Sequence, residues 1–372
     1  MKTSRRYLAL GLETCGRILE DGRRANSSFV SLSGSNRVRG RTSGHVPVMV
    51  DKVVDFMQPE KCQLIVDMTF GAGGHTRKLL EKSSTVRIVC LDRDPVAFSY
   101  AQKLQLEYPD QVLPLHGKFS DLPSLLEAHN IGQNSIDAML FDFGSSSMQF
   151  DDPNRGFALS KDGPLDMRMN TSEEDSVTAA DVLAHASERD LHKILKIYGE
   201  EPQAKQIAKA LVETRTSYGC LRKTSQLKDL VEQTLQNQIR LDKLGRYAHV
   251  STRVFQALRI FVNNEMNEIN YAMIVAQRYL KLGGVMVTLS FHSLEDTIVK
   301  RHVTGNVSEN AANELPMRLY SFSLTFPQES LEPKAKTCWR QINKHVITPD
   351  DLEIASNPRS RSAKLRACVK IR

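Results

Sequence analysis

Four short apolar runs, separated by segments with helical spacing, shape the first part of the globular sequence. They cover 64–66, 86–91, 112–115 and 136–141, and polar or small residues follow each of them. Runs of this length that alternate with amphipathic segments are typical of β-strands joined by helices. The pattern therefore predicts an α/β fold with a parallel sheet and helices on both faces.

The alternation is interrupted between residues 153 and 250. This stretch is polar and turn-rich at first and helical by pattern from 179 to 242, with no strand of good quality. We interpret 153–250 as a helical insertion over the carboxyl edge of the sheet. It divides one core into two parts, 45–152 and 251–372.

The sheet pattern resumes after the insertion. A long helical stripe over 254–276, bent near Asn263-Asn264, is stopped by Gly283-Gly284 and followed by a strand at 285–289. Residues 304–335 form a connection without a clear pattern. The stretches 338–346 and 363–371 are predicted to be a closing pair of strands.

The first 44 residues differ in composition from the rest. They carry nine basic side chains against three acidic ones, a net charge of +6, whereas the whole chain of 372 residues carries +7. An arginine- and serine-rich start that is poor in acids is typical of a mitochondrial presequence; a basic arm that touches RNA is the alternative. We therefore expect residues 1–44 to be a targeting segment, followed by a nearly neutral body that binds nucleic acid only through local patches.

Composition excludes several classes of protein. Hydrophobic residues make up 41% of the chain, as in ordinary globular proteins. No apolar run approaches the ~20 residues of a membrane span, so no membrane partner is expected. The six cysteines are scattered and form no C-x-x-C pair. We therefore predict that the protein has neither a metal site nor a disulfide framework. We also expect it to work in a reducing compartment.

A glycine turn after the first strand is the strongest chemical signal. Asp67 ends that strand, Gly73 and Gly74 follow in the turn, and Asp92 ends the next strand 19 residues after Gly73. Glycines let a ligand approach the backbone, and an acid at this spacing can bind ribose hydroxyls. Thr76 stands where a dinucleotide site needs a third glycine. A ligand with ribose but no pyrophosphate, such as S-adenosylmethionine, therefore fits better; the alternative is a glycine-rich turn in an ordinary core.

Asp142 ends the fourth strand, just before a loop of small residues. Such a loop lets a planar ligand come close, and a carboxylate there could accept the proton that an exocyclic amino group loses when it is methylated. The alternative is that Asp142 caps the following loop through Ser145 and Ser146.

Three further groups of residues are candidates for catalysis or for binding the substrate. His292, at the end of the fifth core strand, is either catalytic or a helix cap. Asp166 and Arg168 either pair with each other or contact a substrate phosphate or base. Arg359 and Arg361 belong to a basic cluster that suits a phosphate backbone; a solvated edge is the alternative.

Other chemistries that act on such substrates lack their motifs here. A zinc deaminase needs H-x-E and P-C-x-x-C, and a serine hydrolase needs G-x-S-x-G after a strand. Neither pattern is present. Methylation of amino groups in DNA would predict a D-P-P-Y-type loop after the fourth strand, and the sequence at 141–147 reads FDFGSSS.

Together these motifs resemble the RsmH (MraW) family, the cytosine-N4 methyltransferases of small-subunit ribosomal RNA. The arginine-rich start makes the chain similar to the animal mitochondrial members of the family. The matching stretches, in chain order, are HVPVM at 45–49, DMTFGAGGHT at 67–76, LDRDP at 91–95, GKFSDL at 117–122, SSSMQ at 145–149, RGFALSKDGPLDMRM at 155–169, YGEE at 198–201, STRVFQALRIFVNNE at 251–265, SFHSLED at 290–296 and NPRSRSAKLRA at 357–367.

The resemblance implies a class I (Rossmann-like) methyltransferase core with an inserted helical domain for substrate recognition. It also implies contacts with S-adenosyl-L-methionine, at Gly73, Gly74, His75, Asp92, Phe119, Asp142 and Gln149. In this interpretation Asp92 binds the ribose, Phe119 packs on the adenine, and Asp142 and Gln149 lie between the cofactor and the cytosine. Family members usually have leucines beside the acid at Asp142, where this chain has Phe141 and Phe143.

The function implied is methylation of N4 of a cytidine in mitochondrial small-subunit (12S) rRNA, in support of mitoribosome assembly and translation. The expected partner is this rRNA or the immature small subunit, and the expected location is the mitochondrial matrix. A different class of function stays open: an assembly factor that binds rRNA and carries a vestigial catalytic site.

Overall fold

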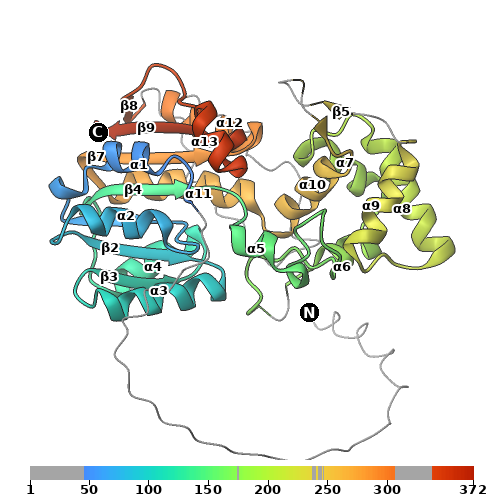
Figure 1. Ribbon diagram of the computed structural model, residues 1–372, viewed down its shortest axis with the longest axis horizontal. Coiled ribbons are helices and arrows are strands. Elements are labelled where there is room, and N and C mark those ends of the chain that lie inside the picture. Colours follow the sequence, from blue (N-terminus) through green and yellow to red (C-terminus); the bar gives the residue numbers. More distant parts are fainter. Residues whose placement is uncertain (1–45, 174–175, 237–239, 242–244, 246, 306–336) are drawn as a thin grey trace, which may run out of the picture. The chain divides into compact units, whose positions relative to one another are not determined.

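The computed structural model describes residues 46–372 apart from 174–175, 237–239, 242–244, 246 and 306–336. The predicted presequence and nearly all of the predicted connection at 304–335 lie outside the described residues. Residues 45–372 form one compact unit (Figure 1). The division of that unit into a core and an inserted domain stays a prediction. Among the described residues, no helix is long and apolar enough to cross a membrane.

One seven-stranded sheet organises this unit, in the order β3-β2-β1-β4-β7-β9-β8. The strands are β1 Leu64–Asp67, β2 Arg87–Asp92, β3 Val112–His116, β4 Ile136–Asp142, β7 Leu280–Ser290, β8 Trp339–Gln341 and β9 Lys364–Lys370. The first five strands of that order pair in parallel, and β9 runs antiparallel to both of its neighbours. The chain leaves β1 toward β2 on one side and returns to β4 on the other, so a ligand crevice is expected at the carboxyl ends of these strands. The predicted α/β, Rossmann-like class is confirmed.

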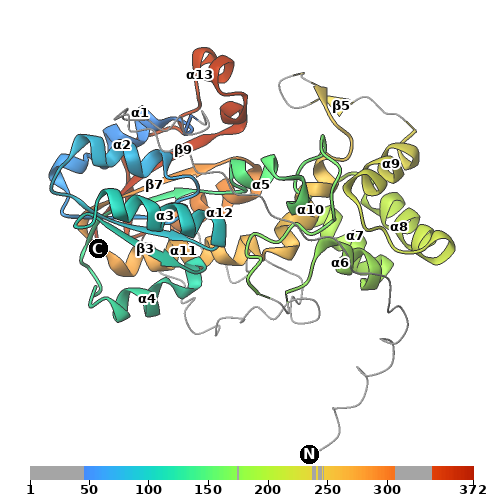
Figure 2. The ribbon, with the colours of Figure 1, turned by 60° about the horizontal axis from the view of Figure 1, so that its bottom comes forward.

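Helices cover both faces of the sheet. They are α1 Val50–Met57, α2 Gly74–Lys82 and α3 Pro95–Glu107 on one face, and α4 Leu122–Ala128, α11 Glu265–Tyr279 and α12 Ser293–Thr304 on the other. Figure 2 shows α1 and α2 on one side of the sheet and α4 and α11 on the other. Side chains alternate along a strand. For this reason Leu140 packs in the core under α1–α3, whereas Phe141 packs in the core under α4 and α11.

The segment predicted as a helical insertion contains several helices, as predicted. Its helices are α6 Ala179–His185, α7 Glu188–Tyr198, α8 Ala204–Tyr218 and α9 Thr224–Thr234; α5 Ser147–Asp151 precedes the segment and α10 Thr252–Val262 follows it. It also contains a short hairpin, β5 Arg240–Leu241 and β6 Tyr247–Ala248, so the prediction of no strand here was wrong. Arg240 holds the hairpin through two hydrogen bonds to the buried Glu201. That contact joins residues 39 positions apart, so the local periodicity of the sequence could not predict it.

The long helical stripe after the insertion is broken where the sequence predicts a bend. Helix α10 ends at Val262 and α11 begins at Glu265, and Asn264 between them has a left-handed φ of 51°. Gly283-Gly284 does not end the helix, contrary to the prediction. Helix α11 ends at Tyr279, and β7 begins at once because Leu280 pairs with Ile136 across a shifted register.

Candidate active site

The rings of Phe70 and Pro47 pack closely against the glycine turn between β1 and α2. Gly73 has a left-handed φ of 78°, and a Cβ on it would lie 2.6 Å from Cζ of Phe70. A Cβ on Gly74 would lie 3.1 Å from the ring of Pro47. Only glycine fits the first position, because both its backbone conformation and the neighbouring ring exclude a side chain. The turn therefore brings bare backbone to the N-terminus of α2.

Thr76 explains the departure from the dinucleotide pattern. Its buried hydroxyl donates to Oδ2 of Asp67 at 2.7 Å, and the backbone N–H of Thr69 donates to Oδ1 at 3.1 Å. A glycine at this position would leave one oxygen of a buried carboxylate without its partner. Thr76 thus closes the turn on the acid that ends β1.

Asp92 ties the glycine turn to the end of β2. Its Oδ2 accepts the N–H of Gly71 at 2.7 Å, and its Oδ1 accepts the N–H of Asp94 at 2.9 Å. Burial raises the pKa of Asp92 to about 6, although these two hydrogen bonds oppose the rise. An ionised carboxylate offers about four lone-pair sites, so two are left for other donors such as ribose hydroxyls.

Asp142 lies at the end of β4 beside the same turn. Its backbone N–H donates to the hydroxyl of Thr69 at 2.7 Å, and its Oδ2 lies 3.9 Å from Nδ1 of His75. Its Oδ1 is buried and has no hydrogen-bond partner among the described residues. Burial raises the pKa of Asp142 to about 6; His75 opposes the rise, and Asp67 and Glu295 add to it. The acid therefore keeps one oxygen uncommitted next to the turn.

His75, in the first turn of α2, faces this acid with a defined nitrogen. Its Nε2 lies 2.9 Å from the carbonyl oxygen of Val48, which can only accept, so Nε2 carries the hydrogen. In the neutral ring, Nδ1 then turns a lone pair toward the Asp142 carboxylate. Nδ1 lies 3.9 Å from Oδ2 of Asp142.

The raised pKa of Asp142 predicts a stabilising substitution. A group whose pKa is higher in the folded than in the unfolded protein stabilises the fold below its ordinary pKa and loses that contribution as the pH rises through its folded value. Asp142→Asn, which imitates the protonated acid, should raise the free energy of unfolding at pH 7 by about 1 to 2 kcal/mol, with an allowance for the 26% exposure of the side chain. Urea unfolding should show this gain at pH 7 and a much smaller one near pH 4.5. A gain that is equal at both pH values would contradict the argument.

Phe119 stands on an aromatic platform at the end of β3. Its ring meets Phe141 and Phe143 edge-on, with centroid distances of 6.1 and 6.2 Å. The next residue, Ser120, donates from its N–H and its hydroxyl to the buried Glu268 of α11. Phe141 and Phe143 therefore support the ring of Phe119 directly.

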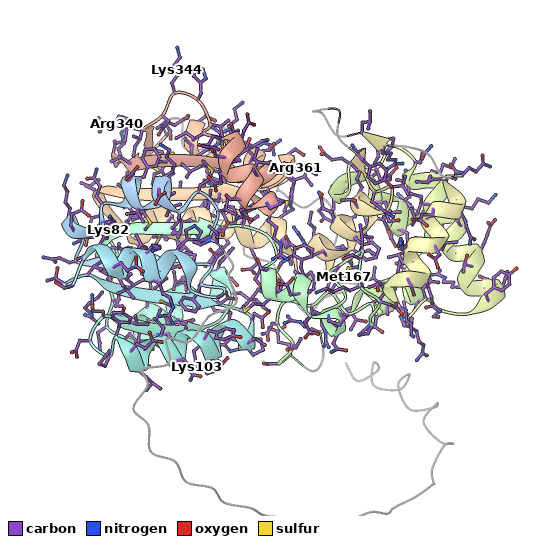
Figure 3. The ribbon with its side chains drawn as sticks, viewed as in Figure 1. Lys82, Lys103, Met167, Arg340, Lys344 and Arg361 are labelled. Carbon is purple, nitrogen blue, oxygen red and sulfur yellow. The ribbon has the colours of Figure 1, made fainter. Side chains whose placement is uncertain are left out.

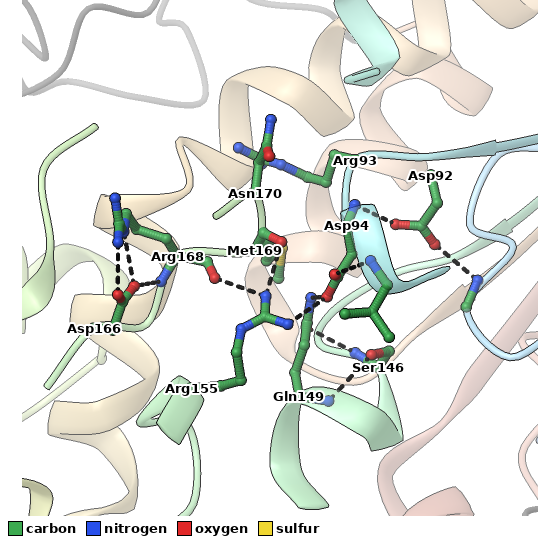
Figure 4. A network of polar contacts seen from close by, with 12 residues as sticks. Asp92, Arg93, Asp94, Ser146, Gln149, Arg155, Asp166, Arg168, Met169 and Asn170 are labelled. Carbon is green, nitrogen blue, oxygen red and sulfur yellow. Dashed lines mark hydrogen bonds and ion pairs between the residues drawn. The ribbon is translucent and has the colours of Figure 1, made fainter. Parts of the chain in front are cut away.

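Gln149 belongs to a buried network that the sequence analysis did not foresee (Figure 4). Its Nε2 donates to Oδ2 of Asp94 at 2.8 Å, and Nη1 of Arg155 donates to the same oxygen at 2.9 Å. Arg155 also donates to the carbonyl oxygens of Arg168 and Met169, at 3.0 and 2.9 Å. Because Asp94 bonds to Asp92 through its backbone, the glycine turn connects without a break to the 168–169 backbone.

Comparison with known proteins decides the family. A sequence model of the MraW methylase family matches residues 42–371. The chain belongs to this family. A Drosophila melanogaster protein named probable methyltransferase-like protein 15 homolog is 52% identical over 88% of this chain and 93% of its own length. The mouse 12S rRNA N(4)-cytidine methyltransferase METTL15 is 42% identical over 98% of this chain and 92% of its own length.

One similar protein is much longer. The chain is 52% identical, over 92% of its length, to a Culex quinquefasciatus protein named as a receptor-type tyrosine-protein phosphatase, mosPTP-1. The match spans only 23% of that protein. Most of the mosquito protein therefore lies outside the shared MraW methylase region.

Two predicted substrate residues of this MraW methylase bind each other. Nε and Nη2 of Arg168 donate to the two carboxylate oxygens of Asp166, both at 2.8 Å (Figure 4). The remaining Nη1 of Arg168 donates to Ser176. The alternative of mutual pairing is confirmed; a role in binding the substrate stays a prediction.

The remaining predicted residues have structural partners too. His292 is the N-cap of α12, and its side chain accepts from the N–H of Glu295. Arg359 forms an exposed ion pair with Asp151 at 2.8 Å. Arg361 is exposed (Figure 3). Catalysis by His292 and RNA binding by the two arginines stay predictions.

The structure thus brings the glycine turn, His75, Asp92 and Asp142 together through direct contacts. Sequence reasoning missed Asp94 and Arg155, although both lie in stretches that resemble the family. A signal was available: each is a charged residue in one of the matching stretches, and neither had been given a role, so each called for a partner of opposite charge.

Proposed function

We propose that this MraW family member is an S-adenosylmethionine-dependent methyltransferase that acts on N4 of a cytidine in mitochondrial small-subunit (12S) rRNA. One observation carries the proposal: the glycine turn holds an acid suited to ribose, Asp92, and an uncommitted buried acid, Asp142, in one hydrogen-bonded arrangement. The mouse relative named for this reaction is similar over nearly its whole length. The protein would work in the mitochondrial matrix on the rRNA or the immature subunit.

The residues fit the proposed cofactor. Gly73 takes a left-handed conformation against the Phe70 ring that only glycine fits, which brings bare backbone to the start of α2, and Asp92 keeps lone pairs for two hydroxyls. Phe119 has the aromatic support that a stacked adenine needs. Asp92 and Asp142 are acidic, which suits a positively charged ligand. When bound, S-adenosylmethionine supplies a methyl group on a positively charged sulfur.

Asp142 would serve the cytosine amine. The lone pair of this amine is delocalised into the ring, so N4 becomes a useful nucleophile only in tight alignment and with an acceptor for the proton it sheds. The free Oδ1 of Asp142 is such an acceptor. With a pKa of about 6, the carboxylate is ionised near pH 7 and close enough to neutrality to take up a proton. The base would have to be unstacked to reach it.

The direct test is a map of N4-methylcytidine in mitochondrial small-subunit rRNA. Cells that lack the protein should lose the modification at one cytidine, and the wild-type chain should restore it. The purified protein with S-adenosylmethionine should methylate the unmodified rRNA in vitro. An unchanged map in cells lacking the protein would exclude the proposal.

Cofactor binding separates an enzyme from an assembly factor with a vestigial site. Calorimetry should detect S-adenosylmethionine binding by the wild-type protein, and Asp92→Ala should weaken it by about 10- to 100-fold, because hydrogen bonds to a charged group are lost. Asp110→Ala makes the same change at an exposed acid in the α3–β3 connection; it is the matched control and should bind normally. Absence of binding by the wild-type protein would favour the assembly factor.

A further inference from the structure

Four charged or titratable side chains meet beneath the loop that follows Asp142. Nε and Nη2 of Arg259 donate to both oxygens of Glu265 at 2.8 Å, and Nη2 also lies 3.8 Å from Oε1 of Glu295. Nε2 of His292 lies 2.9 Å from the same Glu295 oxygen. Glu295 is fully buried and Glu265 nearly so. This cluster of Arg259, Glu265, His292 and Glu295 takes no part in the function proposed above.

The cluster resembles a cation site, since Glu265, His292 and Glu295 offer ligand atoms within 4.8 Å of one another. Arg259 already supplies the positive charge there. Because both Glu265 oxygens bind its guanidinium, a metal ion would have to displace a buried ion pair. The arrangement therefore fits a permanent charge network better than a metal centre.

Glu295 is fixed from two further directions. Its Oε2 accepts the N–H of Phe291 at 2.6 Å and that of His292 at 3.3 Å, so it closes the first turn of α12. Its Oε1 is buried and has no hydrogen bond of good geometry among the described residues. Arg259 is shared with Glu265, so the charge of Glu295 is only partly compensated. Burial raises the pKa of Glu295, but His292, Arg259 and the N–H of Phe291 together outweigh it; the pKa is therefore lowered and the carboxylate stays ionised.

Glu295 lies directly against the loop that carries Asp142. Gly144, two residues after Asp142, has a φ of 97°, and a Cβ on it would lie 3.7 Å from Oε1 of Glu295. The charged groups that act on Asp142 come from three elements: His75 from α2, Asp67 from β1 and Glu295 from α12. Glu265, neutralised by Arg259, is not among them.

We propose that Glu295 is a positioning residue for Asp142: it supports the loop at Gly144 and keeps a fixed negative charge beside the Asp142 carboxylate. The negative charge makes Asp142 a stronger proton acceptor than an isolated carboxylate. His292 takes part by capping α12 and holding Glu295, rather than by contact with the base. The link to catalysis rests on the proposed function; the effect on the Asp142 carboxylate does not.

Titration of Asp142 tests this without any enzymatic reaction. In protein labelled with carboxyl-¹³C aspartate, the Asp142 resonance is assigned by its loss in Asp142→Asn. Its midpoint should lie near pH 6 in the wild type, and Glu295→Gln should move it down by on the order of half a pH unit. Asp110→Asn, which removes an exposed carboxylate in the α3–β3 connection, is the control and should leave the midpoint in place. An unmoved midpoint in Glu295→Gln, or an equal shift in both variants, would overturn the proposal.

A second variant, Glu295→Asp, keeps the test possible if Glu295→Gln does not fold. Glu295→Asp withdraws the charge by one methylene and should move the midpoint in the same direction by a smaller amount. If Glu295→Gln does not fold, an unmoved midpoint in Glu295→Asp overturns the proposal by itself.

Methylation rates add the link to catalysis. The acidic limb of the pH–kcat profile should follow the NMR midpoint in each variant, and kcat at pH 7.5 should fall about tenfold in Glu295→Gln as the loop loosens. If the acidic limb of the pH–kcat profile stays in place while the NMR midpoint of Asp142 moves, Glu295 has no effect on catalysis through Asp142. A wild-type protein that methylates no cytidine would remove the proposed function, yet leave the titration result intact.

Discussion

Asp142→Asn should lower the rate of cytidine methylation by about 10²- to 10⁴-fold, the range that a positioned proton acceptor contributes. The amide keeps the shape of the side chain but cannot take up the proton that N4 sheds. Because burial disfavours the charge of Asp142, the same variant should fold at least as stably as the wild type. Single-turnover rates with unmodified rRNA and saturating S-adenosylmethionine provide the measurement.

The control for this result is Asp110→Asn, which makes the same chemical change at an exposed position. It should retain the wild-type rate. Asp142→Glu gives a second comparison, since it keeps the charge but moves it by one methylene, and it should recover part of the activity. A wild-type rate in Asp142→Asn would remove the assigned role of this acid.

Arg155→Met should destabilise the protein by about 3 to 5 kcal/mol, the usual cost of leaving one partner of a buried ion pair uncompensated. Asp94 is only 1% exposed and would lose the charge that balances it. The carbonyl oxygens of Arg168 and Met169 would lose their donor at the same time. Urea unfolding measures the loss, and the KM for rRNA should rise in the fraction that remains folded.

Arg359→Met is the matched control because it breaks an ion pair of similar length, 2.8 Å against 2.9 Å, between exposed side chains, Arg359 and Asp151. Such a pair contributes at most about 1 kcal/mol. Arg155→Lys should fall between the two, since one ammonium group cannot reach all three acceptors. Equal losses in Arg155→Met and Arg359→Met would show that the buried pair has no special weight.

The buried ion pair of Arg155 and Asp94 connects the parts of the candidate site. Arg155 and Asp94 join the end of β2 to the 168–169 backbone. Asn263, at the break between α10 and α11, holds the same region: its side chain bonds to Met167 and Met169, and its carbonyl accepts from Arg93. The polar contacts thus link the carboxyl edge of the sheet, where the cofactor site is proposed, to the chain segment that leads into the predicted insertion.

Local patterns in the sequence were sufficient to predict the alternation of strands and helices, the break at Asn263-Asn264 and the position of the acids at strand ends. Each of these depends on neighbours in sequence: side-chain period, turn residues and the rule that parallel strands end at one edge. The predicted strand runs at 64–66, 112–115 and 136–141 agree with β1, β3 and β4 to within a residue.

The tertiary structure alone decided what the polar side chains contact. Arg155 meets Asp94 across 61 positions of sequence, and Arg240 meets Glu201 across 39. His292 has two interpretations in sequence, a helix cap and a catalytic residue; its placement at the start of α12 shows the cap, and catalysis stays a prediction. Periodicity records which face a residue occupies, whereas the partner of a buried charge depends on how distant elements pack. Sequence therefore determined the layers and the edge where the site lies, and the fold determined which of its charges are paired and which remain available.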